Sequence, residues 1–210
     1  FTHTGPLVVN YVSGLIDYTY EAFDVSCIPA IDGGTVLVAS SQSGLNSMED
    51  IIKKSKSEPE SIIFGTEFGN YSHLQVLEIQ NQADIEFRMA DVGSTSEKIT
   101  NLLGGRIDLA AITYGSVKDY IETGEMIAIA QFNETPNEYL GDIPTMKSQG
   151  IDMVMDKPYI IAFPEGTDPD IVQKMSDIAV EIGKNPEYQA KLKDGFSQEV
   201  KVLEREEAIK

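Results

Sequence analysis

Residues 35–132 alternate between short β-type apolar runs and amphipathic helical segments, and this alternation constrains the fold more strongly than any other feature of the chain. A helix is predicted between each strand and the next, and two of these helices begin at capping residues, Ser47 and Ser94. The strands are predicted at residues 35–39, 62–64, 85–89, 107–112 and 126–132. Such alternation predicts an α/β protein built from parallel βαβ units with right-handed crossovers. The almost wholly apolar run 107–112 is expected to be the central strand.

The two ends of the chain are patterned differently. Residues 5–30 are loosely patterned, whereas a strand is predicted at 159–163 and a helix from Asp168-Pro169 to about Gly183. A further helix opens at Asn185-Pro186, and a last strand is predicted at 198–203. The apolar residues of the first of these helices recur at helical spacing and are expected to face the core: Ile171, Met175, Ile178 and Ile182.

Charge excludes several classes of partner. The 210 residues include 34 acidic and 16 basic side chains, which gives a net charge of −18. Such a surface repels nucleic acid and anionic membranes. No apolar run approaches the roughly 18–20 residues that a transmembrane helix requires. The single cysteine, Cys27, cannot form an internal disulfide and is expected to be a small core residue.

Motifs of catalysis and cofactor binding are missing from the sequence. It contains no dinucleotide-binding or phosphate-binding glycine motif and no G-x-S-x-G elbow. His3 and His73 have no cysteine or carboxylate at zinc-ligand spacing. Ser72 directly precedes His73, which is poor geometry for a nucleophile and its base. We therefore predict a binding protein with no cofactor and no metal, rather than an enzyme.

The stretch 62–74 predicts a site for a negatively charged group. A β-type run ends in a segment that contains Gly65 and Gly69, and an amphipathic helix follows from Tyr71 to about Gln82. The first N–H groups of a helix lack internal partners and carry partial positive charge. The glycines would let a ligand approach the backbone closely. Side chains that can add hydrogen bonds are those of Thr66, Asn70 and Ser72. The alternative is an ordinary strand–helix loop whose glycines only form the turn, and His73 is expected to hold this loop.

Five segments, in order along the chain, carry a resemblance to a known family. They are Thr35-Val36-Leu37-Val38-Ala39-Ser40, Phe64-Gly65-Thr66-Glu67-Phe68-Gly69-Asn70-Tyr71-Ser72-His73-Leu74, Leu102-Leu103-Gly104-Gly105-Arg106-Ile107-Asp108, Gly141-Asp142-Ile143-Pro144-Thr145 and Phe163-Pro164-Glu165-Gly166-Thr167-Asp168. Their order and spacing resemble those of the extracytoplasmic solute-binding receptors of tripartite tricarboxylate transporters, the Bug-type receptors. The resemblance covers nearly the whole chain and implies a two-lobed α/β fold of the periplasmic-binding-protein type, type II-like.

The resemblance also implies a domain organisation. Lobe one would hold residues 1–40 and 158–210, and lobe two residues 41–157. Family members carry further N-terminal elements, so Phe1 is expected to be an internal start and lobe one to be incomplete. Such a lobe would leave sheet edges exposed or pair them with another copy. Hinge closure is expected near residues 39–42 and 156–159.

By resemblance, the ligand is a small carboxylate held between the lobes, mainly by backbone amides, hydroxyl groups and bridging waters. The positions of this sequence that match the family's ligand site are Thr2, His3 and Thr4 in lobe one, and Thr66, Gly69, Asn70, Tyr71, Ser72, Gly93, Ser94, Thr113 and Tyr114 in lobe two. Loops at the carboxyl ends of strands are also where open α/β sheets bind ligands.

Two departures from the family pattern concern the charge of the ligand. The segment 89–93 lacks the usual tyrosine of a Pro-Tyr-x-Gly rim and adds Asp91, and Glu67 lies inside the anion-binding loop. Each acid would disfavour a multiply charged anion by about 1 kcal/mol at an effective dielectric constant near 20. These departures predict a ligand with one carboxylate, or a zwitterion, over citrate.

The predicted function is that of an extracytoplasmic receptor, periplasmic or anchored at the cell surface. It would capture a small carboxylate or zwitterionic ligand and deliver it to the membrane subunits of a tripartite tricarboxylate-type transporter. One alternative is a sensor subunit of the same fold that reports its ligand state to a signalling partner. The other, an enzyme on a two-lobed α/β scaffold, requires a coupled base and nucleophile.

Overall fold

The computed structural model describes residues 1–12, 14–196, 198 and 200–210. Its contacts divide the chain into two compact units. Unit 1 comprises Phe1–Asp32 and Asp156–Lys210, and unit 2 comprises Gly33–Met155. The lobe boundaries expected at 40/41 and 157/158 stay a prediction about the whole protein.

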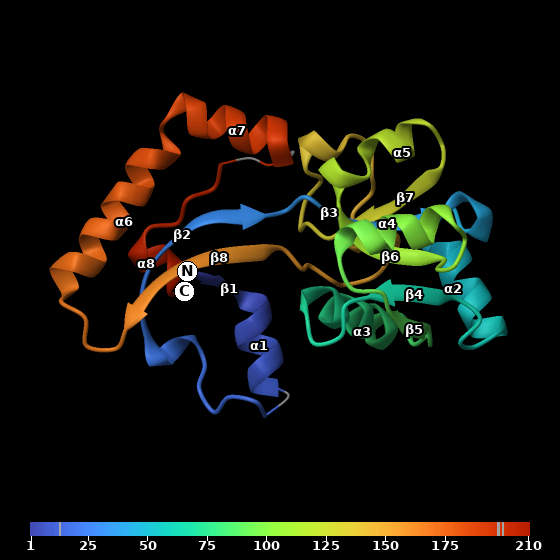
Figure 1. Cartoon of the computed structure of the whole chain (residues 1–210), viewed down its shortest axis with the longest axis horizontal. Helices are drawn as coiled ribbons and strands as arrows, with labels where there is room; N and C mark the ends of the chain where they lie inside the picture. The colour runs from blue at the N-terminus through green and yellow to red at the C-terminus, as the bar shows by residue number, and fades with distance from the viewer. Residues whose placement is uncertain (13, 197, 199) are drawn as a thin grey trace. The chain divides into compact units, whose positions relative to one another are not determined.

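Unit 2 is built on a five-stranded sheet with the order β5-β4-β6-β3-β7 (Figure 1). Its strands are β3 (Thr35–Ser40), β4 (Ile63–Thr66), β5 (Arg88–Asp91), β6 (Leu109–Thr113) and β7 (Met126–Gln131). The helices between them are α2 (Met48–Ser57), α3 (Tyr71–Ala83), α4 (Thr95–Leu103) and α5 (Lys118–Glu122). Strand β6 is the third of the five, so the prediction of a central strand here is confirmed.

The direction of β3 corrects the expectation of parallel strands throughout. β4 pairs in parallel with β5 and β6, but β3 pairs antiparallel with both β6 and β7. The crossover from β6 through α5 to β7 leaves one strand position between these two strands, and β3 fills it. Alternation along the sequence cannot reveal this, because the sheet neighbours of β3 come more than sixty residues after it.

Both faces of the unit 2 sheet are covered, as the apolar character of its strands requires. Leu37 and Ala39 pack in one cluster with buried residues of α2 and α3, while Val36 and Val38 pack in another with α4. Because successive side chains of a strand point to opposite faces, one short strand supplies both clusters.

Unit 1 contains a three-stranded antiparallel sheet with the order β1-β8-β2. Its strands are β1 (Thr2–His3), β2 (Phe23–Asp32) and β8 (Lys157–Pro164). Its helices are α1 (Thr4–Val12), α6 (Pro169–Gly183), α7 (Pro186–Phe196) and α8 (Arg205–Ala208). The longest strand of the described residues, β2, lies largely in the N-terminal region, where the loose sequence pattern did not predict it. Cys27, on this strand, is fully buried, as expected of a small core residue.

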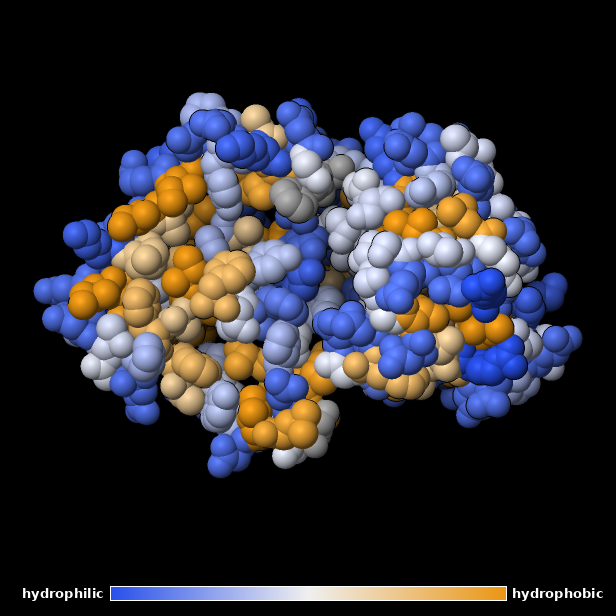
Figure 2. Space-filling model, viewed as in Figure 1, coloured by the Kyte–Doolittle hydropathy of each residue, from blue (hydrophilic) through white to orange (hydrophobic). Residues whose placement is uncertain are grey.

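Helix α6 begins where predicted, with Asp168 as its N-cap and Pro169 in its first turn, but it buries another face than predicted. Its buried residues are Val172, Ser176 and Ala179, and Ser26 Oγ of β2 donates a hydrogen bond to the Val172 carbonyl at 2.8 Å. The predicted core residues Ile171, Ile178 and Ile182 are 54%, 42% and 48% exposed, and Figure 2 shows hydrophobic residues along α6. Small residues let the helix approach β2 closely, so the stripe with larger side chains lies outside.

The last predicted strand, 198–203, includes residue 199, which lies outside the described residues. Among the described residues of this segment, Leu203 forms a bridge with Ile28, and no longer strand is assigned. The charged tail forms the short helix α8.

Candidate functional site

Three neighbouring strands of unit 2 end at the same edge of its sheet. Because β5, β4 and β6 are parallel, their carboxyl ends, Asp91, Thr66 and Thr113, lie along one edge. Thr66 pairs directly with Asp91, and the Val92 N–H donates to the Thr66 carbonyl at 2.9 Å. The structure therefore gathers the predicted residues of unit 2 in the loops that follow these three strands: Thr66, Gly69, Asn70, Tyr71, Ser72, Gly93, Ser94, Thr113 and Tyr114.

The loop between β4 and α3 is held by its own side chains. Asn70 is the N-cap of α3, and its Oδ1 accepts a hydrogen bond from the Tyr71 N–H at 2.6 Å. His73 Nδ1 accepts from the Gly69 N–H at 3.3 Å, and its ring lies 4.9 Å from that of Phe68. His73 therefore holds the loop, as predicted.

The two glycines of this loop have different roles. A Cβ on Gly65 would collide with Ile107 Cδ1, so this buried glycine is required by packing and does not open the backbone to a ligand. The expectation for Gly65 was wrong because the contact comes from a residue more than forty positions away. Gly69 is exposed and has a φ of +78°, a conformation that favours glycine, and a Cβ at this position would meet no atom within 4 Å.

The hydroxyl group of Ser72 is fully used inside the protein. It lies 3.2 Å from the Glu67 N–H, 3.0 Å from Lys98 Nζ and 3.0 Å from Thr66 Oγ1. The N–H and the ammonium group can only donate, so Ser72 accepts from both and donates its own hydrogen to Thr66. Thr66 and Ser72 thus order the loop with their side chains. The backbone N–H of Ser72 has no acceptor among the residues that the structure describes.

Lys98 is the functional candidate that the sequence analysis missed. It is only 5% exposed, and within the described part of the chain no carboxylate lies within ion-pair distance, 4.0 Å, of its Nζ. Burial lowers the pKa of Lys98, and the more distant carboxylates of Glu67 and Asp91 act in the opposite direction without cancelling this effect. A sequence signal existed: Lys98 precedes the buried Leu102 by four residues, so both lie on the same face of α4.

The rim formed by Gly93 and Ser94 is occupied by a carboxylate of the protein itself. Glu97 Oε2 accepts hydrogen bonds from the N–H and the hydroxyl of Ser94, each at 2.8 Å. These bonds form the predicted capping box and lower the pKa of Glu97. A Cβ on Gly93 would lie 2.5 Å from the same oxygen. The N-terminus of α4 is therefore already occupied by a carboxylate, whereas α3 begins at the neutral cap Asn70.

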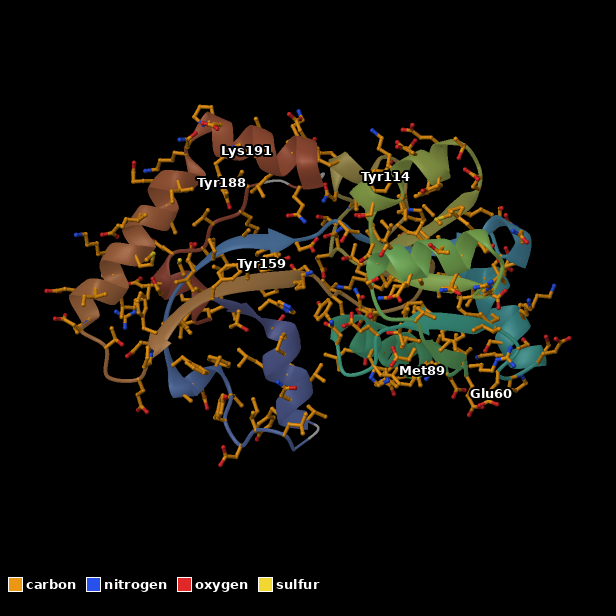
Figure 3. The ribbon with its side chains drawn as sticks, in the orientation of Figure 1. Glu60, Met89, Tyr114, Tyr159, Tyr188 and Lys191 are labelled. Carbon is orange, nitrogen blue, oxygen red and sulfur yellow. The ribbon has the colours of Figure 1, made fainter. Side chains whose placement is uncertain are left out.

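Thr113 and Tyr114 stand at the end of β6. Both are half-buried, and the Tyr114 N–H donates to the Gly34 carbonyl at 2.8 Å. Tyr114, labelled in Figure 3, begins a single 3-10 turn after the strand. This bond fixes the direction in which the chain leaves the sheet edge.

The predicted residues of unit 1 lie on β1 and at the start of α1. Thr2 and His3 pair with Ile160 and Tyr159 of β8, and His3 Nδ1 accepts from the Gly5 N–H at 3.1 Å. Burial, together with the charge of Lys157, lowers the pKa of His3, while Asp32 acts to raise it. A largely neutral imidazole suits this acceptor role.

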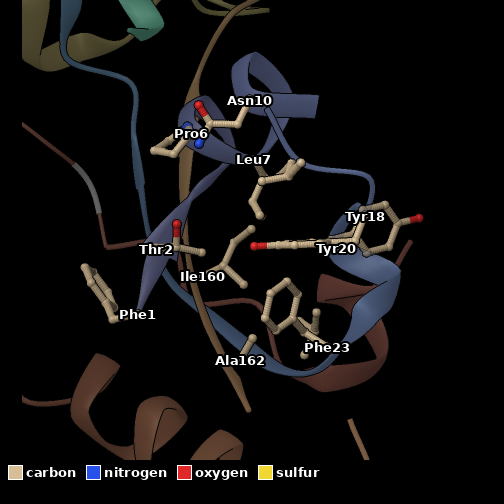
Figure 4. A pocket seen from close by; sticks show the side chains of 12 residues that line it. Phe1, Thr2, Pro6, Leu7, Asn10, Tyr18, Tyr20, Phe23, Ile160 and Ala162 are labelled. Atoms are coloured by element: carbon tan, nitrogen blue, oxygen red, sulfur yellow. The ribbon is translucent and has the colours of Figure 1, made fainter. Parts of the chain in front are cut away.

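Thr2 also lines a cavity of about 340 Å³ in unit 1. Figure 4 shows that its walls are mainly aromatic and aliphatic, with Tyr18, Tyr20, Phe23 and Ile160 among them. Such walls offer little to a carboxylate, which requires donors.

A buried ion pair lies beside His3. Lys157 Nζ is 3.0 Å from Asp32 Oδ2, and Gln198 Nε2 donates to Asp32 Oδ1 at 2.7 Å. The ammonium group also lies 5.4 Å from the ring centre of Tyr159 on β8 (Figure 3). Each charged group of this cluster has a close partner.

Two negative findings apply to the described residues. Within them, no group of three or more His, Cys, Asp or Glu side chains could hold a metal ion. None of their helices is both long enough and apolar enough to span a membrane.

The fold is that of periplasmic binding proteins of the TctC and Bug type. The solved structure of a TctC solute-binding protein from Polaromonas, without ligand, matches with a TM-score of 0.78 at 21% identity, over 95% of this chain and 68% of that one. MatC from Rhodopseudomonas palustris, solved with bound malate, matches with a TM-score of 0.75 at 15% identity, over 92% of this chain and 66% of that one.

The family follows from the sequence match. A family model described as the tripartite tricarboxylate transporter family receptor matches residues 11–207, and the chain belongs to this family. The UPF0065 protein in the gbd 5′ region of Cupriavidus necator is 28% identical over 185 residues, which cover 88% of this chain and 52% of that protein. The chain spans about half the length of the curated relatives it matches. The family is one of receptors, and the Polaromonas neighbour is a solute-binding protein, so the family is not one of enzymes.

Proposed function

We propose that the protein is an extracytoplasmic receptor that captures a small carboxylate and delivers it to the membrane subunits of a tripartite tricarboxylate-type transporter. The observation that carries the proposal is the N-terminus of α3, presented at the carboxyl edge of β4 with the Ser72 N–H lacking an acceptor among the described residues. A helix N-terminus of this kind favours an anion through its free N–H group and its dipole.

The order of the loop supports binding. The Ser72 hydroxyl, the Asn70 cap and the His73 ring all hold the β4–α3 loop before any ligand arrives. A ligand that meets a preordered loop does not have to offset the entropy of ordering it. MatC, which shares the fold and was solved with bound malate, supports a small carboxylate as the ligand class.

In this proposal the residues act in two ways. Gly69, Asn70, Tyr71 and the Ser72 backbone form the anion-binding turn, and the side chains of Thr66 and Ser72 order it. The further residues proposed to border the ligand are Gly93, Ser94, Thr113 and Tyr114 in unit 2, and Thr2, His3 and Thr4 in unit 1. Ligand-dependent hinge closure near residues 39–42 and 156–159 is part of the proposal, and small-angle scattering with and without ligand tests it.

Calorimetric titration of the intact protein with a panel of mono-, di- and tricarboxylates tests the capture step. Asn70→Ala removes the α3 cap, a loss of about 1 kcal/mol that disorders the binding turn, and should weaken binding of the best carboxylate by roughly fivefold. Asn185→Ala is the matched control, because Asn185 likewise caps the first turn of a helix, α7, through the Glu187 N–H at 2.8 Å, and it should bind as the wild type. Absence of binding by every carboxylate would refute the proposal. Uptake of the bound carboxylate with the transporter subunits then separates delivery from sensing.

A further inference from the structure

Two positive groups lie at Ser72, and no described carboxylate lies within ion-pair distance of the first, the Lys98 ammonium group. The ammonium group of Lys98 is buried, and its one hydrogen bond to a described residue is to Ser72 Oγ at 3.0 Å. Ser72 stands in the first turn of α3, where the helix dipole is positive. A cation is disfavoured at this end of a helix, so two positive groups meet at the same serine. An anion beside the Ser72 N–H would attract both the Lys98 ammonium group and the positive end of the α3 dipole.

The nearest acids do not complete this arrangement. Glu67 belongs to the β4–α3 loop and Asp91 to the end of β5, and both carboxylates attract Lys98. Neither comes within 4.0 Å of its ammonium group, and both are accessible to solvent, Asp91 being exposed. The sheet edge therefore presents a positive centre at Ser72 and two solvent-accessible carboxylates with no cation within ion-pair distance among the described residues.

We propose that the ligand is an α-amino acid, whose carboxylate binds at Lys98 and the α3 N-terminus and whose ammonium group is held by Glu67 and Asp91. This inference rests on the proposed function and names its ligand class. The three side chains carry a net charge of −1. A zwitterion leaves that sum unchanged and supplies a partner of the correct sign to each group, whereas a dicarboxylate adds two negative charges beside Glu67 and Asp91.

Matched pairs of ligands isolate the ammonium group. Calorimetry on the intact protein compares L-glutamate with glutarate, L-alanine with propionate and L-leucine with 4-methylpentanoate; the second member of each pair lacks only the α-ammonium group. We expect the amino acid of the best-binding pair to bind at least about tenfold more tightly than its partner, the scale of one well-placed charge pair. The double variant Glu67→Gln/Asp91→Asn should remove most of this difference.

Lys98→Met tests the carboxylate half of the site. It should weaken binding of both members of the best pair by about tenfold or more, while Lys98→Arg, which keeps the charge, should lose less. Lys118→Met is the matched control, since Lys118 lies in an exposed pair with Glu122 on α5, and it should bind as the wild type. Thermal unfolding verifies that each variant is folded.

Every outcome decides the inference. Equal binding by Lys98→Met and the wild type overturns the role of Lys98. A dicarboxylate that binds more tightly than every amino acid, or deaminated acids that bind as well as their amino acids, overturns the ligand class. In these cases carboxylate capture itself stands. Only a wild-type protein that binds no carboxylate in either panel defeats the proposed function together with this inference.

Discussion

Two lysines, one in each unit, are largely buried, but their pKa values are shifted in opposite directions. Burial acts to lower the pKa of Lys157, but the attraction and hydrogen bond of Asp32, with a contribution from Tyr159, outweigh it and raise that pKa. Burial lowers the pKa of Lys98, where the carboxylates of Glu67 and Asp91 are too distant to compensate. The difference is one of partner distance, 3.0 Å for Lys157 and beyond ion-pair range for Lys98.

This difference separates a structural cation, Lys157, from a cation that we propose to bind ligand, Lys98. Removing one member of a close buried pair leaves an uncompensated charge and is strongly destabilising, whereas a buried charge that already lacks a close partner itself reduces stability. Perturbed ionisable groups of the second kind gather at binding and catalytic sites. Lys157 and Asp32 tie β8 to β2 inside unit 1, whereas Lys98 lies near the sheet edge where the ligand is proposed to bind.

The largest expected effect on stability comes from breaking the ion pair between Asp32 and Lys157. Asp32→Asn leaves Lys157 without its counter-charge and should lower the free energy of unfolding by about 2–4 kcal/mol, somewhat below a fully buried pair because the Lys157 side chain is 21% exposed. Urea unfolding measures this loss. Glu134→Gln, which breaks the exposed pair with Lys147, is the control and should show no resolvable change. Equal losses in the two variants would remove the distinction between the pairs.

Removing Lys98, which has no described carboxylate within ion-pair distance, should change the free energy of unfolding in the opposite direction. Lys98→Met removes a buried charge and retains most of the buried volume, so the free energy of unfolding should rise by about 1–2 kcal/mol. Lys157→Met should lower it, since Asp32 would then be buried without its cation. Chemical denaturation of both variants measures whether the free energy of unfolding rises in the first and falls in the second. A destabilised Lys98→Met protein would mean that Lys98 is a structural residue.

The hydrogen bond at Ser72 gives a smaller effect. Ser72→Ala removes the acceptor of Lys98 and of the Glu67 N–H and should cost about 1 kcal/mol. In the background of Lys98→Met the same change should cost less, because one of its two donors is already absent. A double-mutant cycle measures this coupling, and strict additivity would show that the bond between Ser72 and Lys98 contributes nothing. Ser57→Ala, which removes an exposed hydroxyl bond on α2, serves as control.

The smallest expected effect is on the pH dependence of stability, to which Lys98 and Lys157 should contribute slopes of opposite sign. The pKa of Lys98 in the folded protein lies below the ordinary 10.5, so between these values the unfolded chain binds more protons and stability rises with pH. The pKa of Lys157 is raised, so its contribution is present below 10.5 and is lost as the pH rises through the folded value. Unfolding of the wild type, Lys98→Met and Lys157→Met between about pH 8 and pH 11 should show that each variant loses its own slope. A common slope would contradict the comparison.

Local features of the fold were predictable because they depend on neighbours in sequence. Helix α3 was expected from Tyr71 to about Gln82 and runs from Tyr71 to Ala83. The Ser94–Glu97 capping box and the start of α6 after Asp168 were also confirmed. Hydrogen bonds over two to four residues determine each of these, so sequence spacing is sufficient.

Features that depend on distant partners were not predictable in the same way. The direction of β3 follows from its pairing with β6 and β7, and the buried face of α6 follows from the fit of Val172, Ser176 and Ala179 against β2. The apolar periodicity of α6 allowed two faces, and only the approach to a sheet decided between them. The role of Gly65 likewise depends on Ile107.

The sequence by itself determined the order of strands and helices between residues 35 and 132, the capped helix starts, the glycine turn before α3 and the resemblance to a family of receptors. Only the tertiary structure decided that Ser72 uses its hydroxyl internally, that Glu97 occupies the N-terminus of α4 and that Lys98 contacts Ser72 with no described carboxylate within 4.0 Å. The physical reason is that a lysine has the same charge wherever it occurs in a sequence. Its energetic role depends on burial and on the distance to the nearest carboxylate, and both are set by the packing of separate elements.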